Sequence, residues 1–547
     1  MEEIKTTDGE VIIDECVPFS QSKLWDFQRS FYFNESINAW TEKVPFYVTS
    51  NPYIANSYAH FTIRFIQDCL KNKSLDPKLP FYIVELGAGS GTFSFYLLNR
   101  ILELKKLLSI DIKLVYVMTD LIQSNIDFWM NHEGFQPFVD LEQLDFACFD
   151  AEESTEIELI RSGVKIRQDE SNTTKNPFIF IANYCFDSLR HDVFQVSNNK
   201  IYEGLCRSTT PIENFHNGRV KQLDKVGLEF EYHEISLPYY QHESLNELLL
   251  HYAQTTDNQY ISFPIGSLMC IKTLKGLSND KLLLISSDKG FSKHLEIYQS
   301  EEPELVFHDN CFSMSVNFDI IGQYFKFLGG DNFYQFTEQS LTTCAFLSGY
   351  KFDEMHETSL ALETYLNSFG HTTINNLFLN EDFTNTFTSI ESILPLLGAS
   401  KWDVRVFNSC LEVLVSQVRA GYARISDIED LKEKMPIIEH NFYKYPNTVD
   451  TFFDIGLFYQ ETMNYEDSLN YYEKSLSHFG EKENTLYNMG LCYYFLEQPE
   501  KAIIKFTQAL KYNPDHLMAR GWISKIESEK PALNKKDIVK ADLPLVV

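Results

Sequence analysis

The chain has 547 residues, 44% of them hydrophobic, and a formal net charge of −30 at pH 7. This length predicts two to four domains, the acidic balance argues against binding of nucleic-acid phosphates, and no apolar run approaches the ~20 residues of a membrane span. The ten cysteines form no CxxC pair or metal-ligand spacing, and the acidic N-terminus is unlike a targeting signal, so we expect a cytoplasmic protein that binds no metal and docks on no membrane.

Residues 1–44 predict an N-terminal segment that covers an edge of the core with aromatic side chains. The turn Thr49-Ser50-Asn51-Pro52 then leads into an amphipathic helix that ends near residue 70. The pattern favours a packing helix before the first strand. The aromatic side chains of the N-terminal segment are Trp25, Phe27, Phe31, Tyr32 and Phe33.

Residues 81–93 read FYIVELGAGSGTF and predict a buried strand, a glycine turn and the start of a helix. Gly87, Gly89 and Gly91 would let the turn bend sharply and a ligand approach the backbone. Glu85 precedes them, where a carboxylate would repel a pyrophosphate but could pair with a cation such as the ammonium or sulfonium of S-adenosylmethionine. The pattern E-L-G-x-G-x-G resembles the first motif of the class I, S-adenosylmethionine-dependent methyltransferases. The alternative is a structural glycine turn without a ligand.

Two further strand ends carry acidic residues. A second apolar strand, 113–119, ends at Asp120, and a third, 144–149, is followed by Asp150. The resemblance to class I methyltransferases implies that Asp120 accepts hydrogen bonds from the ribose hydroxyls of the cofactor and that Asp150 lies near the adenine amino group. The alternative for Asp120 is a helix cap.

A fourth strand precedes a polar loop. The polar and charged residues 153–176 are predicted to form a helix and a flexible loop. Residues 177–182 are predicted to form a buried strand, which ends in the stretch ANYCFDSL at residues 182–189. The loop after the fourth strand lies over the transferable methyl group in doubly wound methyltransferases, so Asn183, Tyr184 and Asp187 are candidate catalytic residues. Asp187 could accept a proton, and Tyr184 could bind the acceptor. The alternative for Asp187 is a cap on the following helix.

Short motifs over roughly residues 44–345 resemble the MidA family, whose mitochondrial members are protein arginine methyltransferases that serve complex I assembly. In the stretch that begins at residue 182, the family's A-N-E-x-x-D-A-L-P is matched at Ala182, Asn183, Asp187 and Leu189, and Tyr184 stands where the family has glutamate. The turn at 49–52 and the stretch Asp288-Lys289-Gly290 are similar to its T-S-P and D-Y-G elements. Cys311 and Ser315 stand where the family has aspartate and histidine.

The resemblance implies a doubly wound α/β domain over 45–350 with a seven-stranded class I methyltransferase sheet. Residues 200–265 predict an irregular insertion, 282–285 and 341–347 predict the last strands, and 318–328 predict a helix between them.

The rest of the chain is predicted to be helical, with a connector at 351–445 that includes a degenerate helix pair near 404–446. Gly456 and Gly490 lie 34 residues apart, and each is followed three positions later by a tyrosine. Ser468, Tyr472 and Ser475 continue the first unit. The second unit continues with Ala502, Phe506, Ala509 and Pro514. This pattern is typical of tetratricopeptide repeats and predicts an all-α repeat domain at 446–529, with a capping helix at 516–526 and a tail at 530–547.

We therefore expect an S-adenosylmethionine-dependent methyltransferase that acts on a nitrogen, such as that of arginine, in a protein or peptide recruited through the repeat groove. One alternative is an S-adenosylmethionine-binding adaptor without catalysis, which the departures at Tyr184 and Cys311 motivate. Another is a small-molecule methyltransferase whose repeats form a homo-oligomer or pack on the catalytic domain.

Overall fold

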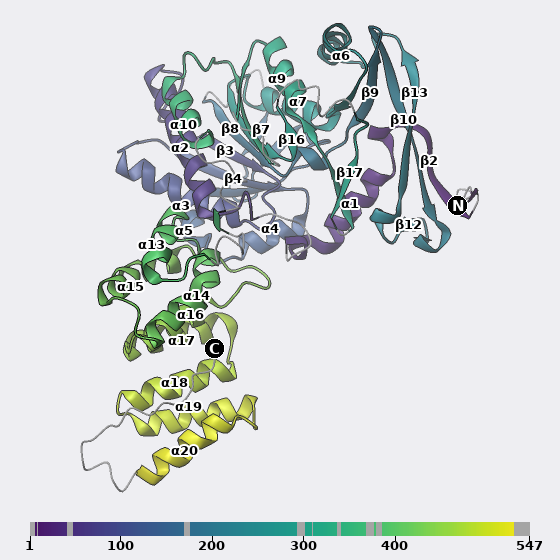
Figure 1. Cartoon of the computed structure of the whole chain (residues 1–547). Coiled ribbons are helices and arrows are strands. Elements are labelled where there is room, and N and C mark those ends of the chain that lie inside the picture. Colours follow the sequence, from purple (N-terminus) through teal and green to yellow (C-terminus); the bar gives the residue numbers. More distant parts are fainter. Residues whose placement is uncertain are drawn as a thin grey trace. The chain divides into compact units, whose positions relative to one another are not determined.

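The structure is a computed structural model that describes residues 6–7, 9–40, 47–168, 176–292, 301–308, 310–335, 341–367, 377–378 and 386–529. The chain divides into two compact units, Met1–Asn375 and Asn376–Val547 (Figure 1). The tail expected at 530–547 lies outside the described residues. No helix in the described parts of the chain is long and apolar enough to cross a membrane.

A seven-stranded mixed sheet forms the centre of the first unit. Five neighbouring strands are parallel, and β21 runs antiparallel to both of its neighbours. The six strands expected from the sequence are all present, and β20 is the seventh. In spatial order the strands are β20 (Asp331–Tyr334), β21 (Thr342–Ser348), β15 (Leu282–Asp288), β8 (Phe178–Asn183), β3 (Phe81–Leu86), β4 (Leu114–Asp120) and β5 (Leu144–Cys148).

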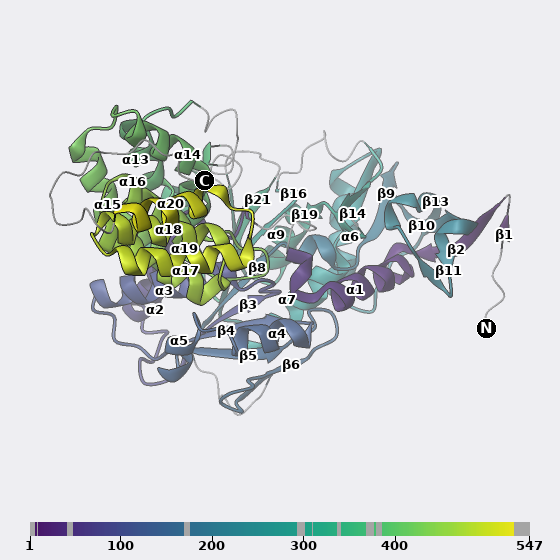
Figure 2. The same ribbon diagram turned by 90° about the horizontal axis from the view of Figure 1, so that it is seen from below.

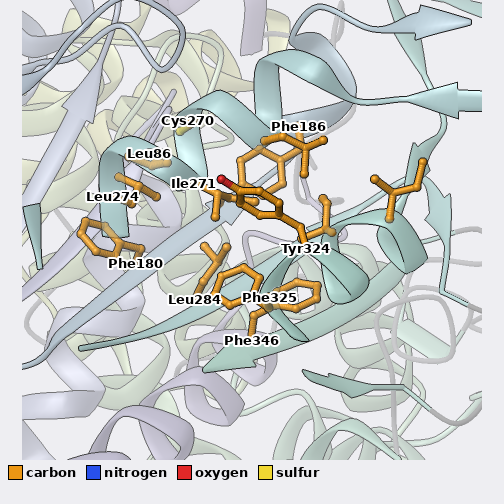
Figure 3. Close-up of a cluster of buried hydrophobic side chains, with 14 of the residues drawn as sticks. Leu86, Phe180, Phe186, Cys270, Ile271, Leu274, Leu284, Tyr324, Phe325 and Phe346 are labelled. Carbon is orange, nitrogen blue, oxygen red and sulfur yellow. The ribbon is translucent and has the colours of Figure 1, made fainter. Parts of the chain in front are cut away.

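Helices α7 (Ile265–Leu277) and α9 (Phe318–Phe327) bury one apolar core against this sheet (Figure 3). Leu274 of α7 and Phe325 of α9 belong to the same cluster as Phe180 of β8 and Phe346 of β21. The rings of Phe325 and Phe346 stack with their centroids 5.1 Å apart. The strands are buried along almost their whole length because their residues are apolar on both faces.

The long helix α2 (Pro52–Lys71) begins as the sequence predicts. The Asn51 side chain accepts a hydrogen bond from the Ile54 backbone N–H at 3.0 Å, and Pro52 occupies the first turn, where its missing N–H costs nothing. The helix contacts α3 (Thr92–Leu107) and α10 (His356–Leu366). Among the described residues of this unit, the other α-helices are α1 (Leu24–Glu35), α4 (Gln123–Met130), α5 (Gln136–Asp140) and α6 (Glu243–Thr255).

Residues 200–265, expected to be irregular, instead form most of a second sheet, which is antiparallel throughout. The N-terminal segment contributes two strands to it, so that segment is more than a cover for the core. Hydrogen bonding along β10 satisfies the backbone of a stretch that looks irregular because its apolar residues are sparse. The strands are β1 (Thr6–Thr7), β2 (Glu10–Pro18), β9 (Asp192–Ser197), β10 (Lys200–Pro211), β13 (Gly227–Ile235) and β14 (Gln259–Phe263).

The prediction of a helix within 153–176 is wrong for the described part of that stretch, residues 153–168 and 176. Strands β6 (Glu156–Glu158) and β7 (Lys165–Arg167) pair there instead, and Ile157 faces Ile166, both fully buried. A single apolar residue between two charged ones is the period-two pattern of a strand. The other short strands are β11 (Phe215–His216), β12 (Arg219–Val220), β16 (Gly290–Phe291), β17 (Leu305–His308), β18 (Cys311–Met314) and β19 (Val316–Asn317).

The second unit is helical in its described part. Helices α16 (Thr451–Glu461) and α17 (Tyr465–Phe479) form one hairpin, and α18 (Glu483–Phe495) and α19 (Pro499–Tyr512) form the next. Before them come α13 (Ile390–Ala399), α14 (Val404–Arg419) and α15 (Ile425–His440), and after them comes α20 (Leu517–Glu529).

Candidate functional site

The parallel strands of the large sheet end together. Glu85 of β3 pairs with Met118 of β4 and Ile181 of β8, and Ser287 of β15 pairs with Asn183 of β8. Because these strands point the same way, the loops that follow them meet at one edge. We call it the carboxyl edge. The strand-end residues that define it are Leu86, Asp120, Cys148, Asn183 and Asp288.

The glycine turn after β3 has the backbone that its sequence predicts. Gly87, Gly89 and Gly91 have φ angles of +61°, +55° and +77°, a left-handed conformation that other residues rarely adopt. A Cβ atom added to Gly87 would meet no atom within 4 Å, so the backbone there lies next to open space. The Trp129 indole donates a hydrogen bond to the Gly89 carbonyl at 3.0 Å, which holds the turn in place.

Glu85 lies buried beneath this turn. Its Oε2 atom accepts hydrogen bonds from the Ser94 hydroxyl and, at 2.7 Å, from the Tyr116 hydroxyl. Burial raises the pKa of Glu85 to about 7, although both hydroxyls oppose the shift. A cation next to this carboxyl group would lower its pKa and so favour the ionised form.

Asp120 ties the turn to the next loop. It accepts hydrogen bonds from the backbone N–H groups of Gly89 at 3.3 Å and Ile122 at 2.9 Å, and from the Asn125 amide at 3.1 Å. Burial raises its pKa, and these donors oppose the rise. The N-cap of helix α4 (Gln123–Met130) is Ile122 and no side chain caps that helix, so Asp120 is not the helix cap that the sequence left as the alternative. Its bond to Gly89 links it directly to the glycine turn.

Asp150 follows β5 and forms an ion pair with Arg29, which lies 121 residues earlier in the chain. Its Oδ2 atom contacts the Arg29 guanidinium, and its Oδ1 atom accepts a hydrogen bond from the Glu152 N–H at 3.0 Å. Arg29 belongs to α1, in the N-terminal segment.

Asn183 ends β8 and has one amide atom without a partner. Its Oδ1 atom accepts a hydrogen bond from the Tyr58 hydroxyl at 2.8 Å. No described residue accepts a hydrogen bond from its buried Nδ2 atom. A buried donor without an acceptor is costly, so this position suits a ligand that brings one. Tyr184 follows with φ +49°, a strained conformation for a bulky residue, and burial raises its pKa.

Asp187 lies against a second carboxyl group, that of Asp288 at the end of β15. Burial raises the pKa of Asp187 to about 6 and the pKa of Asp288 well above its ordinary value, and each group acts on the other. The Phe186 N–H donates to Asp288 Oδ2 at 3.1 Å, while no described donor reaches Oδ1. Burial and the neighbouring Asp187 thus favour the protonated form of Asp288, whereas Lys289 favours the ionised form of Asp187.

The helix that Asp187 was expected to cap, as the alternative to catalysis, is only the 3-10 turn η3 (Phe186–Ser188). Asp187 itself lies within that turn, so it does not precede a helix as a cap would.

Sequence reasoning did not assign Tyr58 or Asp288 to the site. Asp288 could have been found, because it ends a predicted strand in the same sheet and begins the D-K-G stretch. Tyr58 had no signal of its own, since it looks like one more apolar residue of a packing helix.

Comparisons with known proteins bear on each unit separately. Residues 447–514 match the tetratricopeptide repeat model. Among solved structures, a COG1565 superfamily member and candidate methyl transferase from Burkholderia thailandensis, bound to S-adenosyl-homocysteine, is similar at 11% identity and a TM-score of 0.37, over 61% of this chain and 88% of that one. An uncharacterized COG1565 superfamily protein from the same organism is similar at 10% identity and a TM-score of 0.36, over 61% and 87%. No curated protein matches the chain in sequence.

The tetratricopeptide repeats expected from the glycine spacing are thus confirmed. A Cβ atom on Gly456 would lie 2.8 Å from the Tyr472 ring, and one on Gly490 would lie 2.5 Å from the Phe506 ring. Each glycine lets one helix of a hairpin approach an aromatic ring of the other.

Proposed function

We propose that the protein is an S-adenosylmethionine-dependent methyltransferase. The observation that carries the proposal is the turn of three left-handed glycines at the carboxyl edge, beneath which Glu85 is buried and beside which the neighbouring strand β4 ends in Asp120. A dinucleotide would place phosphates here, and the carboxylates would repel them. A cationic nucleoside suits the same surroundings.

The residues at the carboxyl edge fit this cofactor. Gly87 offers backbone beside open space, where the cofactor can approach, while the buried Nδ2 donor of Asn183 is left for the methyl acceptor. We assign Gly87, Gly89 and Gly91 to the amino-acid part of the cofactor, Asp120 to the ribose and Asp150 to the adenine. Glu85 would complement the positive charge.

When bound, the cofactor supplies an electrophilic methyl group. The chain's own task is then to hold a nucleophile in line and to take away its proton, and positioning at about 3 Å accounts for much of the acceleration. Asp187 is the proton acceptor in this proposal, because its pKa of about 6 leaves it mostly ionised at neutral pH. Tyr184 and Asn183 would contact the acceptor.

The acceptor is proposed to be a protein or peptide nitrogen, recruited through the tetratricopeptide repeats of the second unit, since such repeats bind peptides along their concave face. The short motifs similar to the MidA family support this choice. Tyr184 supports a second candidate, an adaptor that binds the cofactor without transfer, because it replaces a carboxylate that could hold a cationic acceptor.

Isothermal titration of the full chain with S-adenosylmethionine tests the cofactor proposal. We expect binding, and we expect Gly87→Ala to weaken it by about tenfold or more, because a side chain at φ +61° would distort the turn. Gly218→Ala is the matched control, since Gly218 has φ +77° and open space too but lies in the hairpin between β11 and β12. Absence of binding to the wild type at high micromolar cofactor would contradict the proposal.

Transfer is tested with radiolabelled cofactor and cell lysate. Label in protein supports the proposed acceptor class, and label only in small molecules contradicts it. Cofactor binding without any transfer would favour the adaptor.

A further inference from the structure

Helix α1 lies over the loops of the carboxyl edge. In both overall views α1 runs between the two sheets of the first unit (Figures 1 and 2). Its side chains and those of η2 (Ser36–Trp40) bond to helix α4, which follows β4, and to the segments that follow β5 and β8. These three segments follow or contain three of the proposed site residues, Asp120 at the end of β4, Asp150 after β5 and Asp187 after β8.

The first attachment is an ion-pair cluster built around Arg29. One guanidinium nitrogen contacts Asp150, and another lies 3.2 Å from Glu152 Oε2. Glu152 also accepts hydrogen bonds from the Arg190 backbone N–H and guanidinium, both at 2.8 Å. Burial raises the pKa of Glu152, and Arg190 and Arg29 oppose that rise. Arg29 therefore neutralises two carboxylates that lie two residues apart and would otherwise repel each other.

Two further attachments, at Gln28 and Ser36, lie on either side of Arg29 in the chain. The Ser36 hydroxyl donates to Asn125 Oδ1 at 3.0 Å, and the Asn125 amide donates to Asp120. The Gln28 amide donates to the Ser188 carbonyl at 3.1 Å and accepts from the Phe312 N–H at 3.4 Å. The segment is thus bonded to the loop beside each candidate contact with the nucleoside.

We propose that Arg29 is a positioning residue for the adenosyl end of the cofactor, and that α1 covers that end when the cofactor is bound. Arg29 holds Asp150 by one oxygen, which leaves the carboxylate in a fixed orientation with lone pairs still available to the adenine amino group. The inference rests on the proposed function, because it needs the nucleoside at the carboxyl edge.

The test measures binding and dissociation of S-adenosyl-homocysteine with the full chain. Arg29→Met keeps an unbranched, flexible stem but removes the guanidinium and its charge, and it should raise the dissociation constant about tenfold, mainly through faster dissociation. Arg29→Lys keeps the charge but not the fork that contacts two carboxylates, so it should recover part of the loss. Arg64→Met is the matched control, because Arg64 forms a 3.2 Å ion pair with Glu357 on α10.

The outcomes separate the two proposals. If the wild type does not bind S-adenosyl-homocysteine, the proposed function fails and the inference fails with it. If the wild type binds and Arg29→Met binds equally well, only the inference is overturned. Tighter binding by Arg29→Met would also overturn it, because the ion pair would then compete with the nucleoside.

Hydrogen exchange of the wild type gives a readout that does not depend on a variant folding. Added S-adenosyl-homocysteine should slow exchange in residues 24–35 as well as in 148–154. Slower exchange at the glycine turn with no change in α1 would overturn the inference.

Discussion

Glu85 keeps a proton near neutral pH at the place where the proposed cofactor brings positive charge. Its pKa of about 7 results from burial, which the Ser94 and Tyr116 hydroxyls only partly offset. A cation beside it would favour the ionised form and lower that pKa. The protonation of Glu85 and the binding of the cofactor should therefore be coupled.

This coupling predicts that S-adenosylmethionine releases a proton when it binds. At pH 6.5 most of the free protein carries the Glu85 proton, so binding should release a large fraction of one proton, and the affinity should rise as the pH increases through about 7. Titration calorimetry in buffers of different ionisation enthalpy measures the release. Glu85→Gln should lose this part of the release, and an unchanged release in that variant would contradict the prediction.

The site residues differ in how far the sequence could predict them. Gly87, Gly89 and Gly91 have the left-handed backbone that their spacing indicates, and strand-end acids such as Asp120 reach the same edge because the strands are parallel. Their roles toward a ligand stay predictions. The contact of Arg29 with Asp150, 121 residues away, has no local signal, because either residue alone reads as a solvated charge.

At the scale of the elements, apolar runs predict strands correctly, whereas polar stretches do not predict secondary structure reliably. Every strand predicted from a run of buried residues is present. Strand β20 was missed because its four residues, Asp331–Tyr334, are only half-buried and half of them are polar. The second sheet was missed for a related reason: a sheet with partly exposed faces shows weak alternation rather than an apolar run.

The repeat hairpins allow a sharp test of packing. Gly490→Ala should destabilise the second unit by about 1–3 kcal/mol, because the new Cβ atom would lie 2.5 Å from the Phe506 ring. Gly521→Ala, in α20, meets no atom within 4 Å and should instead stabilise the unit by about 0.5–1 kcal/mol through helix propensity. Denaturant unfolding measured by circular dichroism compares the two. Equal effects of the same sign would contradict the packing described for the repeat.

At the scale of the whole molecule, the proposed cofactor residues all belong to Met1–Asn375, whereas the repeats belong to Asn376–Val547. Each unit has its own apolar clusters. The carboxyl edge and the repeats can therefore be perturbed separately.

Scanning calorimetry should resolve this division. S-adenosyl-homocysteine at a hundredfold excess over its dissociation constant adds about 2.7 kcal/mol to the stability of the unit that binds it. We expect it to raise the melting temperature of one transition, and Gly490→Ala to lower that of another. A single transition that responds to both changes would contradict two separately melting units.

The pairing of β2 with β10 has a consequence for synthesis of the chain. The buried Asp14 carboxylate accepts a hydrogen bond from Ser208 at 2.7 Å, across 194 residues. At ribosomal speeds of about 5–20 residues per second, Ser208 is synthesised roughly 10–40 s after Asp14. Strands β3, β4, β5 and β8 are made in that interval, so these four strands of the carboxyl edge emerge before the amino-terminal strand β2 can pair with β10.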